Sequence, residues 1–327
     1  MSFSSSAGPG PIVTVSIVNY ATPADAADCA KKAHEALSGI SHEILVWDNA
    51  PEESEVLLGL DLECLGYSRD GRNLGFGRGN NKNLDAATGQ YFLVLNPDVE
   101  INREAVVSCL STLEAKSSIA AVTPLLRNLD GTVQASNRKF PSLRTELARV
   151  FGLDRTKGSS FSTLLDLRPG SGLVAVDQPA GASILVRTSL LKTLGGFSAD
   201  YALYFEDVDL ARRLSRHGSL VVDTEHSFTH ASEGTAKLVR MQTIFWIERN
   251  RIRYHFEHTR GISGPLCIVL AGISAATHGI IWLFLSMARR SESRREALSR
   301  ARGYFLGPAS WLLGSERHWR KTYLGIS

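Results

Sequence analysis

Cysteine is scarce in this chain, and its positions exclude some kinds of site. Four cysteines occur among 327 residues, and no two of them form a C-x-x-C pair. Scattered thiols argue against a zinc knuckle or a disulfide framework and are typical of a reducing compartment. The formal net charge of +3 is too small to indicate a nucleic-acid-coating surface. We therefore expect a cytoplasmic protein with no nucleic-acid partner.

Export signals and the common phosphate-binding loops are also missing. Residues 1–11 are rich in Ser, Gly and Pro, with neither a basic nor an apolar region, and we expect them to be a flexible leader. The glycine-rich segment 73–81 lacks a G-K-[ST] ending and does not match G-x-G-x-x-G. Its glycines would still let the backbone approach a ligand closely, with polar side chains facing phosphate or sugar. The residues concerned are Gly75, Gly77, Arg78 and Asn81.

The chain does contain an alternation of short β-branched runs and longer helix-period segments. From Ile12 onward this alternation predicts an α/β fold with a mostly parallel central sheet. A long polar stretch, 127–171, is expected to contain mobile loops. The expected strands are 12–18, 43–47, 62–67, 91–95, 121–123, 174–176, 183–186 and 220–222, and the expected helices are 24–37, 82–88, 188–194 and 210–216.

Polar groups follow the first four expected strands. Asn19 and Tyr20 follow the first strand, Asp48 follows the second, the glycine-rich segment follows the third, and Asn96-Pro97-Asp98 follows the fourth. Ligands bind outside the carboxyl ends of parallel strands in open α/β sheets. These groups should therefore line one crevice.

Two of these polar residues, and one histidine later in the chain, have both a functional and a structural explanation. Asp98 could hold a divalent cation against a diphosphate, although Asn-Pro-Asp is also good turn chemistry. Asp48 suits donors on a base or ribose, and capping of a nearby helix explains it equally well. His230, after the last expected strand, could complete the metal site as a neutral imidazole, but a lone histidine is more often structural.

A second acidic cluster follows three aromatic residues. Glu206 and Asp207 lie in an apolar setting, where desolvation would raise a carboxylate's pKa and make it a better proton acceptor. A sugar hydroxyl that attacks an anomeric carbon needs such a base. Alternatively, these acids and Asp209 cap the following helix and pair with its arginines.

The C-terminal third differs in composition from the rest. Residues 262–287 are mostly apolar over about the length that spans a bilayer. Proline and polar residues interrupt the stretch, and several arginines follow it. We expect 262–327 to be helical and to touch a membrane surface. Packing on the rest of the chain or in a homodimer is the alternative.

Together these motifs resemble glycosyltransferase family 2, in particular its bacterial rhamnosyltransferase-like branch. The resemblance implies a GT-A (nucleotide-diphospho-sugar transferase) fold over 12–261, an inverting mechanism, and Mg²⁺ or Mn²⁺ on the donor diphosphate. Many members carry an aspartate where this chain has Asn96. The segments that carry the resemblance are 15–20, 46–50, 73–77, 80–81, 96–98, 181–182, 195–197, 205–209 and His230.

The resemblance also assigns roles to individual residues. It implies Asp207 as the general base, Glu206 as the residue that orients the acceptor, and Asp98 with His230 at the metal. Asp48 would recognise the base. The residues expected to contact the nucleotide-sugar are Asn19, Tyr20, Asp48, Gly75, Gly77, Arg78, Asn81 and Asn96.

The implied reaction builds bacterial surface polysaccharide. The favoured donor is dTDP-rhamnose, and the acceptor is a glycan or a polyprenyl-diphosphate-linked sugar at the inner face of the cytoplasmic membrane. The alternatives are a transferase for a UDP-linked hexose and a catalytically idle module that binds nucleotide sugars or carbohydrate. A nucleotidyltransferase is less consistent with the sequence, because no glycine-rich basic loop follows the first expected strand.

Overall fold

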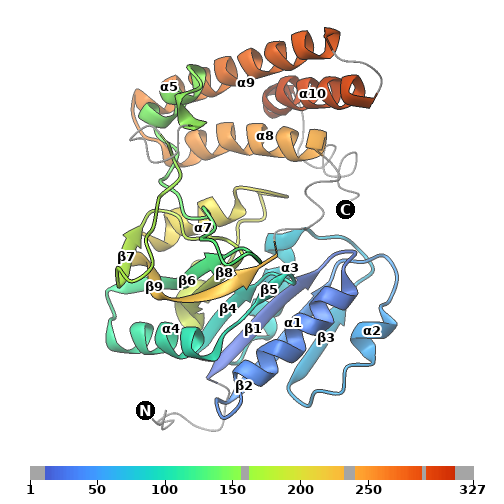
Figure 1. Cartoon of the computed structure of the whole chain (residues 1–327), viewed down its shortest axis with the longest axis vertical. Coiled ribbons are helices and arrows are strands. Elements are labelled where there is room, and N and C mark those ends of the chain that lie inside the picture. The colour runs from blue at the N-terminus through green and yellow to red at the C-terminus, as the bar shows by residue number, and fades with distance from the viewer. Residues whose placement is uncertain (1–11, 156–161, 232–239, 289–291, 314–327) are drawn as a thin grey trace. The chain divides into compact units, whose positions relative to one another are not determined.

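The computed structural model describes residues 12–155, 162–231, 240–288 and 292–313 (Figure 1). The expected leader, 1–11, lies outside the described residues. The chain forms two compact units that interleave along the sequence. The first unit comprises 1–138, 167–199 and 210–232, and the second comprises 139–166, 200–209 and 233–327.

The described part of the first unit is organised by a nine-stranded sheet (Figure 1). Its strands are β1 (Val13–Asn19), β2 (His42–Asp48), β3 (Leu65–Arg69), β4 (Tyr91–Leu95), β5 (Val99–Glu100), β6 (Ile119–Arg127), β7 (Leu173–Val176), β8 (Ser183–Arg187) and β9 (Ser219–His230). Their order is β3-β2-β1-β4-β8-β6-β9-β5, with β7 beside β9. β3, β2, β1 and β4 run parallel, and β8 is antiparallel to both of its neighbours. The parallel half confirms the prediction from alternation.

Small side chains allow the first helix to lie close to this sheet. α1 (Pro23–Ala36) has proline in its first turn, where the missing N–H costs no hydrogen bond. Its buried alanines belong to the same core as the β-branched residues of β1. The remaining helices of this unit are α2 (Glu55–Leu58), α3 (Phe76–Ala86), α4 (Arg103–Ala115) and α6 (Thr188–Thr193), of which α2 and α4 were not among the expected helices.

Residues 76–81 of the glycine-rich segment form the first turns of a helix, whereas the sequence predicted a helix only from residue 82. α3 begins at Phe76, directly after Gly75, whose φ of 83° is a left-handed value. A Cβ on Gly79 would lie 2.9 Å from Val18 and 3.0 Å from Trp47. The glycines therefore serve partly to bring α3 close to β1 and β2, which helical periodicity alone does not reveal.

The last strand is longer than expected. β9 continues to His230, whereas the sequence predicted a strand that ends near Val222. It pairs with β6, with a register shift at Pro124, and then with β5, opposite Val99. The second half of β9 is polar and partly exposed, so it lacks the apolar run that identifies a buried strand.

The second unit is helical where it is described. It contains α5 (Leu143–Val150), a 3₁₀ turn (Leu153–Arg155), α8 (Arg240–His258), α9 (Ser263–Met287) and α10 (Glu292–Leu313). α8, α9 and α10 pack on one another, and α5 packs on α9. The expected helical C-terminal region is thus confirmed for its described residues. α5, stabilised by a capping box, lies in the stretch that was expected to form loops.

Candidate active site

The carboxyl ends of β1 and β2 bring two of the predicted residues into contact. Asn19 Nδ2 donates a hydrogen bond of 2.8 Å to Asp48 Oδ1. The same oxygen accepts from the backbone N–H of Ala50 at 2.9 Å, and Asp48 Oδ2 accepts from the Tyr67 hydroxyl at 2.9 Å. Asp48 is fully buried. Its carboxylate is therefore held rigidly by neighbouring strands, and its contact with a nucleotide base stays a prediction.

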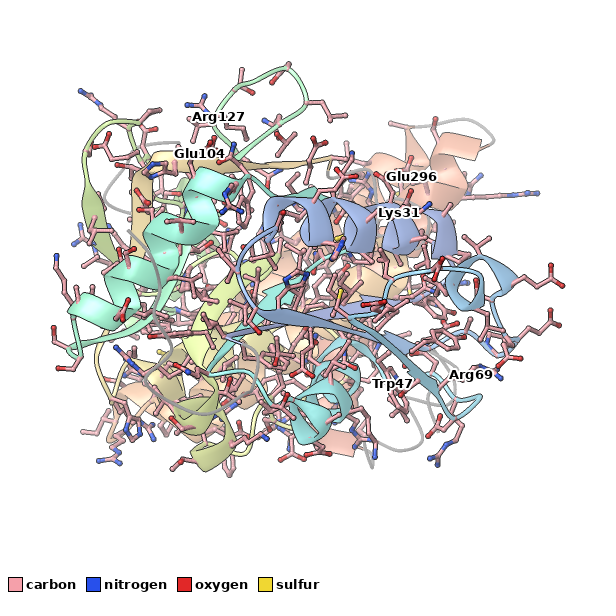
Figure 2. All side chains as sticks on the ribbon, turned by 90° about the horizontal axis from the view of Figure 1, so that it is seen from below. Lys31, Trp47, Arg69, Glu104, Arg127 and Glu296 are labelled. Atoms are coloured by element: carbon pink, nitrogen blue, oxygen red, sulfur yellow. The ribbon has the colours of Figure 1, made fainter. Side chains whose placement is uncertain are left out.

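Tyr67 was missed by sequence reasoning, because only the parallel pairing of β2 and β3 places it beside Asp48. Burial, followed by the hydrogen bond to Asp48, raises the pKa of Tyr67. The phenol therefore remains a proton donor at neutral pH. Trp47 and Arg69 lie at the same ends of these two strands (Figure 2), and Arg69 adds a cation there, in register with Asp48.

Asn49 connects the end of β2 to the start of α3. Its Oδ1 accepts hydrogen bonds from Trp47 Nε1 and from the backbone N–H of Leu74, both at 3.0 Å. Its Nδ2 donates to the carbonyl of Gly75 at 3.2 Å. This buried amide fixes the turn that precedes the helix. Asn49, one of the residues 46–50 that carry the family resemblance, therefore has a structural role.

Asp98 and His230, which are far apart in sequence, lie side by side as predicted. His230 Nε2 is 3.2 Å from Asp98 Oδ1, and both side chains are partly exposed. The antiparallel pairing of β5 with β9 creates this proximity. The backbone N–H of Ala231 also donates to the carbonyl of Asp98 at 3.0 Å.

Gln134 orients the imidazole of this pair. Gln134 Nε2 donates to Asn128 Oδ1 at 3.0 Å, so its Oε1 faces His230 Nδ1 at 2.8 Å. His230 then donates from Nδ1, and a neutral ring presents the Nε2 lone pair toward Asp98. Two facing lone pairs repel unless a proton or a metal cation lies near both. This arrangement fits a divalent cation.

Asn96, a predicted donor contact, is held by its backbone, whose N–H donates to the carbonyl of Ala182 at 2.9 Å. Its Oδ1 is buried and has no hydrogen-bond partner among them. A buried acceptor without a partner costs about 1–3 kcal/mol, so a ligand that donates to it would gain binding energy there. Many family members have an aspartate at this position, and the asparagine of this chain still offers a side-chain oxygen as an acceptor there.

Other predicted donor contacts have partners within the protein. Asn81 holds the backbone of Phe197 through two hydrogen bonds of 2.8 Å. Arg78 Nη2 donates to the carbonyl of Ala199 at 3.3 Å. Tyr20 is exposed. The contacts of these side chains with a donor stay predictions.

The acidic cluster of the second unit follows a strained backbone. Tyr204 and Phe205 have φ values of 62° and 72°, which non-glycine residues rarely adopt. Asn250, on α8, donates from Nδ2 to the carbonyls of Leu203 and Tyr204 at 2.9 and 2.8 Å. α7 (Glu206–Leu214) begins directly after this strained turn, with Glu206 as its first residue. The sequence gives no sign of the strain.

The first two acids of α7 differ in environment. Glu206 is buried, and one of its oxygens has no hydrogen-bond partner among the described residues. Burial, and then the charge of Asp207, raise the pKa of Glu206 to about 8. Asp207 is only partly buried, and its Oδ1 accepts from the backbone N–H of Val208 at 2.9 Å.

Asp209 has a structural partner. His258 Nε2 lies 2.7 Å from Asp209 Oδ1, and both side chains are nearly buried. The Tyr201 hydroxyl donates to the adjacent Glu257 at 2.7 Å. Asp209 thus ties α7 to α8. All three acids lie in the first turn of α7, where the helix dipole favours negative charge. Asp98 belongs to the first unit and Asp207 to the second, so their common crevice stays a prediction.

Glu206→Gln is expected to remove a pH dependence of stability. The protonated carboxyl is favoured in the folded state, so its contribution is complete below about pH 4.5 and is lost as the pH rises towards about 8. Urea unfolding across this window should show the free energy of unfolding of the wild type falling by on the order of a few kcal/mol relative to Glu206→Gln. The exposed Glu63→Gln serves as the matched control. Equal pH slopes in Glu206→Gln and the wild type would count against the burial of a protonated acid.

The fold of the chain is the GT-A fold, which is named after glycosyltransferases. The chain is similar in structure to a mannosyltransferase from Pyrobaculum calidifontis, solved in complex with GDP-Man and Mn²⁺. The TM-score is 0.52 at 15% sequence identity, over 94% of this chain and 89% of that one. Residues 14–166 match the model of glycosyl transferase family 2. This match covers just under half of the chain and assigns residues 14–166 to that family.

Two relatives show what similar sequences do. The low-salt glycan biosynthesis hexosyltransferase Agl10 of Haloferax volcanii is 26% identical over 226 residues, 66% of this chain and 67% of that protein. The N-acetylglucosaminyl-diphospho-decaprenol L-rhamnosyltransferase of Mycobacterium tuberculosis is 29% identical over 181 residues, 51% of this chain. The match covers 59% of that rhamnosyltransferase.

Proposed function

We propose that this protein transfers L-rhamnose from dTDP-rhamnose to a glycan or a polyprenyl-diphosphate-linked acceptor, with inversion at the anomeric carbon. The observation that carries the proposal is the pairing of Asp98 with His230, beside a buried acceptor on Asn96 and in the same unit as the Asn19–Asp48 contact. The similarity to an N-acetylglucosaminyl-diphospho-decaprenol L-rhamnosyltransferase supports L-rhamnose as the transferred sugar and a lipid-linked acceptor. A UDP-linked hexose is the alternative donor, supported by the similarity to a hexosyltransferase.

Asp98 and His230 would hold Mg²⁺ or Mn²⁺ in this protein. A carboxylate oxygen and a neutral imidazole nitrogen both suit such a cation, and Gln134 selects the required tautomer. When bound, the cation neutralises negative charge on the leaving nucleoside diphosphate. The side chains of the protein bind and orient the two substrates around it.

The two acids at the start of α7 have different roles: one donates a hydrogen bond and the other accepts a proton. Glu206 is kept protonated at neutral pH by burial, so it can donate a hydrogen bond to the acceptor and hold it. Asp207 takes the proton of the acceptor hydroxyl while that oxygen forms a bond to the anomeric carbon. The bond from this carbon to the diphosphate oxygen breaks in the same step, and the nucleoside diphosphate leaves with the electron pair.

A panel of nucleotide sugars tests the proposed donor. The purified full chain, supplied with Mn²⁺ and a lipid-linked N-acetylglucosamine, should release nucleoside diphosphate fastest from dTDP-rhamnose. Turnover only with a UDP-linked hexose would replace the proposed donor with the alternative. Binding of a nucleotide sugar in a calorimeter without turnover on any acceptor would instead identify a catalytically idle module.

We also propose that α9 places the protein on the inner surface of the cytoplasmic membrane. By length and composition α9 could cross a membrane, and only 28% of its most apolar window is buried within the protein. Large side chains such as Val269 and Phe284 are exposed along it. Burial of this exposed apolar surface in lipid would be favourable, and it would bring the protein to the bilayer in which a lipid-linked acceptor resides.

Charges on the exposed face of α9 should abolish membrane binding. We expect the wild type to float with vesicles of mixed neutral and anionic lipid, and Val269→Glu/Phe284→Glu to remain in the soluble fraction, because a buried carboxylate is costly in lipid. Val56→Glu, on the exposed surface of α2, is the control and should float. If the double variant floats normally but changes from dimer to monomer in light scattering, the face is a homodimer interface and the membrane proposal fails.

A further inference from the structure

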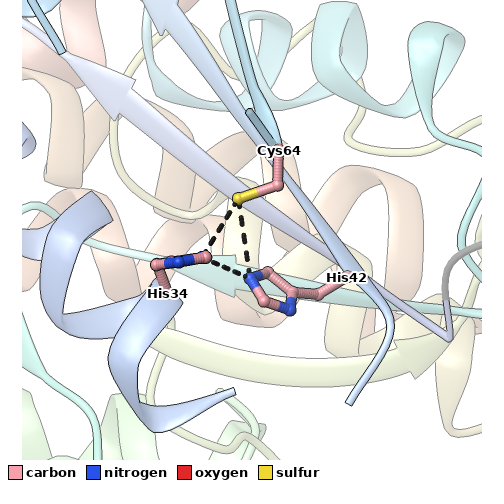
Figure 3. Close-up of side chains that lie close together, drawn as sticks. All are labelled: His34, His42 and Cys64. Carbon is pink, nitrogen blue, oxygen red and sulfur yellow. Dashed lines mark hydrogen bonds between the residues drawn. The ribbon is translucent and has the colours of Figure 1, made fainter. Parts of the chain in front are cut away.

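Three metal-ligating side chains meet at the amino-terminal edge of the parallel strands (Figure 3). His34 lies in the last turn of α1, His42 is the first residue of β2, and Cys64 directly precedes β3. Asp48 ends β2, six residues after His42, so the cluster lies about 20 Å along the strand from the Asn19–Asp48 contact. The proposed transfer reaction makes no use of these three side chains.

The distances within this cluster match those around a tetrahedral zinc ion. His34 Nδ1 and His42 Nε2 are 3.0 Å apart. Cys64 Sγ lies 3.3 Å from the first nitrogen and 3.6 Å from the second. With Zn–N of about 2.0–2.1 Å and Zn–S of about 2.3 Å, tetrahedral angles require about 3.4 Å between nitrogens and about 3.6 Å from nitrogen to sulfur. Shifts of a few tenths of an ångström would accommodate the ion.

The surrounding backbone positions the ligand atoms. His42 Nδ1 donates to the carbonyl of Ile40 at 2.7 Å, so a neutral ring presents the Nε2 lone pair to the other two groups. The carbonyl of Cys64 accepts from the N–H of Ile44 at 2.8 Å, which fixes the cysteine beside β2. A backbone acceptor behind a ligating imidazole is the usual support of a zinc site.

We propose that His34, His42 and Cys64 bind Zn²⁺, with the fourth position open to water or an added ligand. Two imidazoles and a thiolate select this borderline-soft ion over Mg²⁺, which requires oxygen ligands. The ion would join α1, β2 and β3 at the edge of the sheet away from Asp48. Sequence spacing could not show this site, because its single cysteine forms no C-x-x-C pair and its histidines lie on separate elements.

Protection of the Cys64 thiol tests the proposal on the full chain. All four cysteines lie among the described residues, and Cys64 is the one that is not buried. Native alkylation by iodoacetamide, followed by mass spectrometry of the peptide, should therefore report Cys64. We expect Zn²⁺ to slow this alkylation at least about tenfold, since a coordinated thiolate is no longer a free nucleophile. Mg²⁺ at the same concentration should have no effect. An equal alkylation rate with and without Zn²⁺ would overturn the proposal.

Variants separate this site from other zinc-binding surfaces. His34→Gln and His42→Gln should each lose the protection, whereas His217→Gln, an exposed histidine outside the cluster, should retain it. A chromophoric chelator in competition should report one tightly bound Zn²⁺ in the wild type and at least about tenfold weaker binding in Cys64→Ser. Unchanged affinity in Cys64→Ser, or protection that persists in both histidine variants, contradicts the site. Equal circular dichroism spectra of the metal-free proteins confirm that the variants fold.

Discussion

Asp207→Asn is expected to lower kcat for sugar transfer by about 10²–10⁴-fold while KM for the donor changes by less than about twofold. The amide has nearly the same shape as the carboxylate, and it can still accept the hydrogen bond from Val208 at the start of α7. It cannot accept the proton of the acceptor hydroxyl. The loss should therefore appear in the chemical step, measured as initial rates of transfer at saturating acceptor.

Two matched variants distinguish this role from a general effect of charge. Asp200→Asn, on an exposed carboxylate that pairs with Arg253 in the same unit, should stay within about twofold of the wild type. Glu206→Gln keeps a hydrogen-bond donor at the position of the protonated acid, so we expect a smaller loss than for Asp207→Asn. A wild-type rate in Asp207→Asn would eliminate this residue as the general base.

Asp98→Asn and His230→Gln are expected to make transfer require much more Mn²⁺. Each change removes one of the two proposed ligands, so we expect a loss of at least about 10²-fold in activity at limiting metal, partly recovered at high metal. Gln134→Ala should cost less, about 10–100-fold in metal affinity, because it removes only the group that orients His230. Rates measured as a function of Mn²⁺ concentration give both quantities.

A control variant and two possible results decide the metal titration. Asp130→Asn changes an exposed carboxylate in a turn of the same unit and should leave the Mn²⁺ dependence unaltered. Full activity of the wild type in EDTA, or the same Mn²⁺ dependence in Asp98→Asn as in the wild type, would show that this pair does not hold the cation.

Local sequence patterns predicted the parallel half of the sheet well. β1, β2 and β4 are short, strongly apolar and buried, so their runs are visible without any knowledge of their partners. Parallel pairing then places the ends of β1 and β2 together, which confirms that Asn19 and Asp48 are neighbours. Asp98 and His230 also meet as the resemblance implied.

The rest of the site depends on contacts between distant segments that no local pattern reports. Gln134 reaches His230 across 96 positions, and Tyr67 reaches Asp48 only because β3 lies beside β2. Asn250 supports the strained turn before Glu206 from a helix in another part of the sequence. The start of α3 was predicted at residue 82 and lies at Phe76, because glycine usually indicates a loop. Here a glycine instead permits close packing of the helix on the sheet.

The anomeric configuration of the product tests the central claim most directly. The proposed reaction has one displacement at the anomeric carbon, with Asp207 as the base. Nuclear magnetic resonance of the product formed from the preferred donor should therefore show the configuration opposite to that in the nucleotide sugar. Retention of the donor's configuration would contradict the mechanism and the role of Asp207.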